Sequence, residues 1–201
     1  FDACTKCGRC HEACPATASG APLSPRDLIL DLRRFAENTQ GKVKAGGPQL
    51  VGDIISPETL WACRSCGACM EICPVGVEHP TMIVQMRRHL VEHDEMEPQL
   101  RATFGMIANR GNSFGESPRL RGSWTQPLEF KVKDIRDAAA DNLWFVGDYA
   151  SYDPRNQIVS QTVARLFQAA ELDFAILGDG EHSAGNDVRR AGEEGLFESL
   201  V

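Results

Sequence analysis

The sequence "CTKCGRCHEACP", Cys4–Pro15, carries four cysteines within eleven positions, and "CRSCGACMEICP", Cys63–Pro74, repeats the same arrangement. In each copy the cysteines are separated by two, two and three residues, and a proline follows the fourth. The two copies use all eight cysteines of the 201-residue chain. Side chains in such a run converge on one point, which suits a metal centre better than disulfide pairing. Free thiols indicate a reducing compartment.

The spacing is that of bacterial two-cluster ferredoxins, in which the fourth cysteine of each run binds the other cluster. Gly8 and Gly67 would let each loop curl around a [4Fe–4S] cube. We therefore expect two [4Fe–4S] clusters with crossed ligation. The first would be bound by Cys4, Cys7, Cys10 and Cys73, and the second by Cys63, Cys66, Cys69 and Cys14. Zinc, the alternative metal, explains neither the third cysteine nor the proline of each copy.

Composition narrows the classes of function further. The net charge of −7 and the pI of about 5.3 argue against nucleic acid as the main partner, because phosphate binding needs a basic face. The apolar runs are too short to span a bilayer. Because the chain starts at Phe1 and reaches its first motif at Cys4, we interpret it as a fragment or a processed chain.

The 48 residues between Cys14 and Cys63 are predicted to be helical. Ser24 and Ser56 each precede a proline, which is typical of a helix N-cap followed by the first helical position. The first of these helices, 24–37, carries Leu28, Ile29, Leu32, Phe35 and Ala36 at near-helical spacing, and residues 40–49 are predicted to form a loop. A further helix after the second motif places Met82, Ile83, Met86 and Leu90 on one face, as core residues.

Four histidines lie near these elements. His11 and His79 stand beside the motifs and could hydrogen-bond a cluster. His89 and His93 share one helix face, so they could bind a metal or haem. The acidic residues around them favour a solvated surface instead, and no third ligand is placed by the sequence.

The C-terminal half has a different pattern. We expect a helix near 98–109, an extended connection to 140, strands at 142–148 and 172–178, and a helix at 153–171 between them. The apolar face of that helix is predicted to be Ile158, Val159, Val163, Leu166, Phe167 and Ala170. Strand–helix–strand of this length predicts a parallel unit with a right-handed crossover. The loops 147–152 and 178–186 would then meet at the edge where ligands usually bind.

Residues 1–97 resemble the α-helical ferredoxin domain, in which helices separate two cubane motifs along the sequence. That domain occurs in iron–sulfur subunits of succinate dehydrogenase and fumarate reductase, in a glycerol-3-phosphate dehydrogenase subunit and in heterodisulfide reductase subunits. The resemblance implies an electron-transfer subunit.

The sequences "VGDYASYDPRNQ" and "ILGDGEHSAGNDVRRAGEEGLF" resemble the CCG domain that follows the helical ferredoxin domain in heterodisulfide reductase-like subunits. The family has a cysteine where this chain has Asp148, and Cys-Cys-Gly where it has Ser183-Ala184-Gly185. This departure argues against disulfide cleavage at a cysteine-bound cluster here. Asp148 and Ser183 would be inert replacements, or Asp148 would ligate iron, or it would bind a substrate with Tyr149, His182 and Asn186.

We thus expect an α-helical 2[4Fe–4S] ferredoxin domain at 1–97, a helix and linker at 98–140, and a partial α/β CCG-like domain at 141–201. The expected function is electron transfer inside a heterodisulfide reductase-like oxidoreductase complex, without catalytic residues in this chain. The partners would be other subunits, including a membrane cytochrome b-type or quinone-reactive one. The location would be cytoplasmic, peripheral on the membrane. The alternative is a catalytic reductase subunit with its active site around Asp148 and Ser183.

Overall fold

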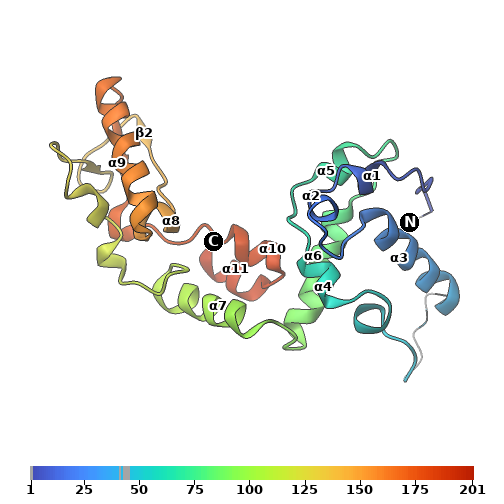
Figure 1. Ribbon diagram of the computed structural model, residues 1–201. Helices are drawn as coiled ribbons and strands as arrows, with labels where there is room; N and C mark the ends of the chain where they lie inside the picture. The colour runs from blue at the N-terminus through green and yellow to red at the C-terminus, as the bar shows by residue number, and fades with distance from the viewer. Residues whose placement is uncertain (1, 41, 43–45) are drawn as a thin grey trace. The chain divides into compact units, whose positions relative to one another are not determined.

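The computed structural model describes residues 2–40, 42 and 46–201, and it is mostly helical with one small parallel sheet (Figure 1). It forms two compact units. The first contains the chain up to Glu95 together with Arg189–Glu193, and the second contains Met96–Val188 and Glu194–Val201. The predicted boundaries at 97 and 140 stay a prediction. The return of Arg189–Glu193 to the first unit was not anticipated.

The first unit is built from short helices around the two cysteine runs. Its elements are α1 (Arg9–Glu12), α2 (Pro15–Ala18), α3 (Pro25–Thr39), the irregular turn η1 (Leu50–Ile54), α4 (Pro57–Trp61), α5 (Ala68–Glu71) and α6 (His79–Glu92). Figure 1 shows α1 and α5, which each follow the second cysteine of a run, side by side. The first unit therefore brings the two motifs together although they are far apart in sequence.

Two serine caps set the directions of α3 and α4. The Ser24 hydroxyl accepts a hydrogen bond from the Asp27 amide, and the Ser56 hydroxyl accepts one from the Thr59 amide, each at 3.2 Å. Both predicted helix starts are confirmed. Part of the predicted loop 40–49 lies outside the described residues.

The core of the first unit lies between α3, α4 and α6. Leu28, Ile29 and Leu32 of α3 are buried against the predicted face of α6, where Ile83, Met86 and Leu90 are also buried. Burial of each such side chain contributes about 1.5–3 kcal/mol. The core thus holds in place the helices that carry the cysteine loops.

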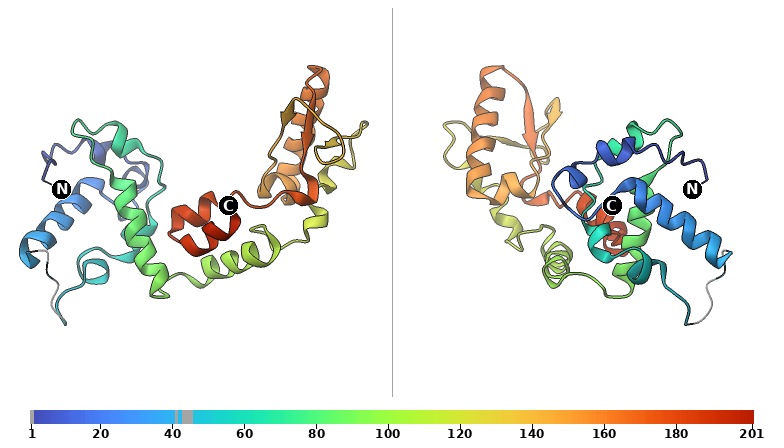
Figure 2. Two further views of the ribbon diagram at one scale, coloured as in Figure 1. Left: turned by 180° about the vertical axis from the view of Figure 1, so that it is seen from behind. Right: turned by 45° about the vertical axis from the view of Figure 1, so that its right-hand side comes forward.

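The second unit contains four helices, three 3₁₀ turns and three strands: the helices are α7 (Pro98–Arg110), α8 (Asp148–Tyr152), α9 (Pro154–Ala169) and α11 (Glu194–Leu200), and the turns are η2 (Pro118–Leu120), η3 (Ser123–Thr125) and η4 (Gly178–Gly180). A further helix, α10 (Asn186–Ala191), begins in this unit and continues into the segment Arg189–Glu193. The strands β1 (Lys133–Asp134), β2 (Asn142–Leu143) and β3 (Phe174–Ile176) are parallel, in the order β1–β3–β2. Figure 2 shows α9 (orange) alongside β3. The predicted β2–α9–β3 unit is present, and β1 was not predicted.

Two predictions about the second unit are wrong. The strand at 142–148 is only two residues long, and both of its residues are exposed. The inward face of α9 consists of Ser160, Ala164 and Phe167; Phe167 belongs to the predicted face, whereas Ile158, Val159 and Leu166 of that face are exposed. The small side chains at 160 and 164 leave room for large aromatic rings, since Trp124, Trp144, Phe167 and Phe174 pack together with neighbouring ring centroids 5.2–6.1 Å apart. Apolar periodicity alone could not identify a packed face made of small residues.

The segment Arg189–Glu193 lies against the backbone of α6. A Cβ on Gly192 would come within 2.5 Å of the Arg88 nitrogen and 2.9 Å of the Arg87 carbonyl carbon. The φ of Gly192 is also +90°, a conformation that favours glycine. Only glycine fits this contact without displacement.

Replacing Gly192 by Ala is therefore expected to release this segment. Gly20→Ala is the matched control, because Gly20 has a φ of +80° but open space around its Cβ position. Both variants should share the cost of positive φ, and Gly192→Ala should cost about 1–3 kcal/mol more through overpacking. Hydrogen exchange of Arg189–Glu193 measures the release. Equal exchange in the two variants would contradict the contact.

Candidate functional site: two cysteine sets and a buried ion network

The two cysteine loops have the same backbone twist. Lys6 and Gly8, which flank Cys7, have φ of 59° and 86°, and Ser65 and Gly67, which flank Cys66, have φ of 50° and 80°. Left-handed residues at matching places turn successive amides in one direction, which forms a concave surface for an anion. The sequence repeat is thus a structural repeat.

The first set of cysteines lines one pocket. Cys4, Cys7 and Cys10 of the first run are joined there by Cys73 of the second. Burial raises the pKa of Cys10, and the nearby Cys4 and Cys73 raise it further. A backbone hydrogen bond from Arg9 lowers the pKa of the exposed Cys7. Cys73 therefore lies with the first run, whereas the other three cysteines of its own run do not line this pocket.

The second set is grouped around Cys69. The pKa of Cys69 is raised to about 11, mainly by burial and also by the neighbouring Cys63, Cys14 and Cys66. Cys14 thus lies near the second run, as Cys73 lies near the first. All eight cysteines are free thiols in the structure.

The polar groups around both sets fit a [4Fe–4S] cluster. The Ser65 amide donates to Cys63 Sγ at 3.3 Å, and the Val77 amide donates to Cys73 Sγ at 3.4 Å. His79 Nδ1, on a residue lining the first pocket, and Ser65 Oγ, in the second loop, are buried without a partner among the described residues. Sulfur atoms of bound clusters would supply the missing acceptors.

The other histidines have structural or surface positions. His11 Nδ1 lies 2.9 Å from the hydroxyl of Ser24, the N-cap of α3. His89 and His93 are exposed, and their ring centroids are 4.1 Å apart. They border an apolar pocket of about 500 Å³ that Phe35 and Met86 also line. Among the described residues no three His, Cys, Asp or Glu side chains are close enough to hold a single metal ion.

The second unit brings Asp148 and Ser183 to one cavity of about 350 Å³, together with Tyr149 and Asn186. The loops that follow β2 and β3 therefore meet, as the sequence predicts. His182 is exposed and does not line this cavity.

Both carboxylate oxygens of Asp148 are already occupied. One accepts from Arg121 Nη2 at 2.7 Å, and the other accepts from the Ser113 amide at 2.8 Å and from the Ser113 hydroxyl at 3.1 Å. This arrangement fits a structural ion pair and leaves Asp148 poorly suited to bind iron.

Arg121 and Glu181 complete a buried network that the sequence analysis missed. The Arg121 side chain is 3% exposed and the Glu181 side chain 1%. Arg121 Nη1 donates to Glu181 Oε1 at 2.8 Å, and the amides of Val146 and Gly147 also donate to the Glu181 carboxylate. These ion pairs and hydrogen bonds tie the two loops together. No local motif marks either residue, because they come from segments 60 positions apart.

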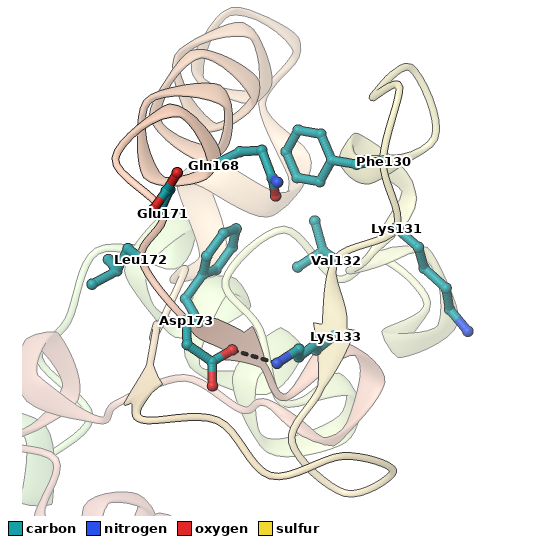
Figure 3. A pocket seen from close by; sticks show the side chains of 9 residues that line it. Phe130, Lys131, Val132, Lys133, Gln168, Glu171, Leu172 and Asp173 are labelled. Atoms are coloured by element: carbon teal, nitrogen blue, oxygen red, sulfur yellow. Dashed lines mark hydrogen bonds and ion pairs between the residues drawn. The ribbon is translucent and has the colours of Figure 1, made fainter.

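A separate pocket in the second unit, of about 320 Å³, lies between Phe130–Lys133 and Gln168–Phe174 (Figure 3). Its side chains include the ion pair of Lys133 with Asp173. It contains no cysteine and none of the residues singled out from the sequence.

Comparison with known proteins bears on the first unit directly. Residues 3–78 match the family described as "4Fe-4S dicluster domain". The chain is a 4Fe–4S dicluster protein related to heterodisulfide reductase subunits. The zinc alternative is thereby set aside.

Three relatives align with nearly the whole chain. The "Probable membrane-anchored ferredoxin" of Chromohalobacter salexigens is 35% identical over 100% of this chain and 33% of its own length. The "EtfAB:quinone oxidoreductase" of Syntrophomonas wolfei is 28% identical over 100% of this chain and 32% of its own. One subunit of the "Dihydromethanophenazine:CoB--CoM heterodisulfide reductase" of Methanosarcina barkeri is 29% identical over 96% of this chain and 47% of its own.

The dicluster chain thus spans a third to about half of the length of these relatives. No solved structure matches it. None of the helices in the described part of the chain is long and apolar enough to cross a membrane.

Replacing Arg121 by Met should destabilise the second unit by about 3–5 kcal/mol, because it leaves the buried Glu181 carboxylate and the partly buried Asp148 carboxylate without a counter-charge. Arg136→Met is the matched control. Arg136 pairs with Asp134 and Asp179 at 2.5 and 2.6 Å and lowers the pKa of Asp134 to about 2, but its side chain is 50% exposed. The loss there should be below about 1 kcal/mol.

Urea unfolding followed by the fluorescence of Trp124 and Trp144, with Trp61 replaced by Phe throughout, measures both losses. Iron content should not change. Loss of iron from Arg121→Met would show that the network takes part in cluster binding.

Proposed function

We propose that this chain is an electron-transfer unit of a multi-subunit oxidoreductase related to heterodisulfide reductase. The observation that carries the proposal is the grouping of each run of three cysteines with the fourth cysteine of the other run. Irons with full cysteine ligation have no open position, so such clusters move single electrons and bind no substrate.

Crossed ligation is part of this proposal. Cys4, Cys7, Cys10 and Cys73 would hold the first cluster, and Cys63, Cys66, Cys69 and Cys14 the second. The first unit would then be an α-helical ferredoxin domain, and the second a partial CCG-like domain whose cysteines have been replaced. The contacts of Asp148 support this description, because a carboxylate bound to Arg121 and Ser113 acts as a structural tie.

The names of the relatives suggest the kind of partner. They include a membrane-anchored ferredoxin, a quinone oxidoreductase and a heterodisulfide reductase. We infer that this chain passes electrons to or from other subunits, among them a quinone-reactive or cytochrome b-type membrane subunit, on the cytoplasmic face of a membrane.

A catalytic role for the cavity beside Asp148 and Ser183 is the second candidate, supported by the meeting of the two loops there. The occupied oxygens of Asp148 weigh against it. Purified protein separates these functions. Electron transfer requires about eight irons per chain and two reversible one-electron signals by electron paramagnetic resonance (EPR). A further signal that Asp148→Ala alters would support the catalytic alternative, and redox-silent clusters would indicate a docking module.

Crossed ligation is tested by matching variants. Cys7→Ser and Cys66→Ser mark the first and second clusters, because each residue is the central cysteine of its own run. Cys73→Ser should then disturb the same EPR signal as Cys7→Ser, and Cys14→Ser the same signal as Cys66→Ser. The reverse matching would show that each run binds its own cluster alone.

A further inference from the structure

Arg87 of α6 is a buried cation next to the second cysteine run. It is 5% exposed, and its guanidinium lies 5.2 Å from the ring centre of Trp61. It donates to the carbonyl oxygens of Leu60 at 2.7 and 3.0 Å, of Cys63 at 2.6 Å and of Arg190 at 2.9 Å. The guanidinium is therefore held rigidly at the start of the second loop.

No carboxylate is among the contacts of Arg87 within the described part of the chain. A buried charge is costly unless an opposite charge compensates it. Carbonyl dipoles satisfy the N–H groups of Arg87 but supply no net negative charge. The second set of thiolates with its cluster would supply such a charge, since Arg87 donates directly to the carbonyl oxygen of Cys63.

The first cysteine run has a weaker counterpart. Arg26 lines the first pocket, but its side chain is 37% exposed and it pairs with Asp27 at 2.9 Å. Water and the carboxylate both reduce the field of this cation at the first set. The loop cations Lys6, Arg9 and Arg64 are exposed and are screened in the same way.

We propose that Arg87 makes the second cluster, bound through Cys63, Cys66 and Cys69, the more easily reduced of the two. Reduction adds one negative charge to a cluster, and a nearby buried cation stabilises that charge. The cation therefore raises the reduction potential, because this potential depends on the net charge around the cluster. One electron that leaves the first cluster reduces the second, so the step needs no further reactant. This inference rests on the proposed electron transfer and adds its internal direction, from the first cluster to the second.

The potentials of the unmodified protein test the direction first. In a redox titration followed by EPR, the signal that Cys66→Ser perturbs should appear at a higher potential than the signal that Cys7→Ser perturbs. The opposite order overturns the proposal, whatever the variants of Arg87 do. Absence of reversible signals would instead refute the proposed function itself.

Two variants then test the cause. Arg87→Met keeps an unbranched side chain and removes the charge, and it should lower the equilibrium constant for electron transfer from the first to the second cluster by about tenfold or more, which is about 59 mV for one electron. Arg87→Lys keeps the charge and should retain most of the difference. Arg26→Met, the matched control, should shift the first cluster by less than Arg87→Met shifts the second.

The proposal fails if Arg87→Met leaves the second potential unchanged or shifts both clusters equally. It also fails if Arg87→Lys lowers the second potential as far as Arg87→Met, because loss of packing and not loss of charge would then be the cause. Iron and sulfide content measured on each variant shows that both clusters are present.

Discussion

The constraint on which the first unit depends is that two short loops with the same backbone twist must face each other. Left-handed residues at 6 and 8, and again at 65 and 67, fix the twist, and the contact of α1 with α5 fixes the facing. The capped helices α3 and α4 and the buried face of α6 can be understood as the support that holds two irregular loops in register. Irregular loops of this kind would not keep the arrangement without a packed core behind them.

Much of the first unit could be predicted because its signals are local. The cysteine spacing, the Ser–Pro helix starts at Ser24 and Ser56, and the apolar face of α6 each lie within a short stretch of sequence. Arg87 could not be recognised in the same way. It reads as one cation among several on α6, and its three carbonyl partners come from α4, from the second loop and from a segment 103 positions away.

In the second unit the order of the elements was predicted, but the packed face of α9 and the ties between the loops were not, for a related reason. The parallel β2–α9–β3 order follows from the alternation of apolar stretches. The packed face of α9 depends on Trp124 and Trp144, which demand small side chains opposite them, so the apolar residues at 158, 159 and 166 gave the wrong face. Asp148 and Ser183 were correctly expected at adjoining loops. The ties between those loops, Arg121 and Glu181, were not, because nothing near either residue in the sequence indicates burial.

The two units differ in what they require from the cell, because only the second contains the buried network of Arg121, Glu181 and Asp148. The loops of the second unit are held together by the protein's own side chains. The cysteine loops of the first unit need inorganic iron and sulfide to neutralise and bridge them. Iron starvation or oxidative damage should therefore impair the first unit and spare the second. A chain that loses its clusters would keep its second unit folded, and repair of the first unit could begin from that state.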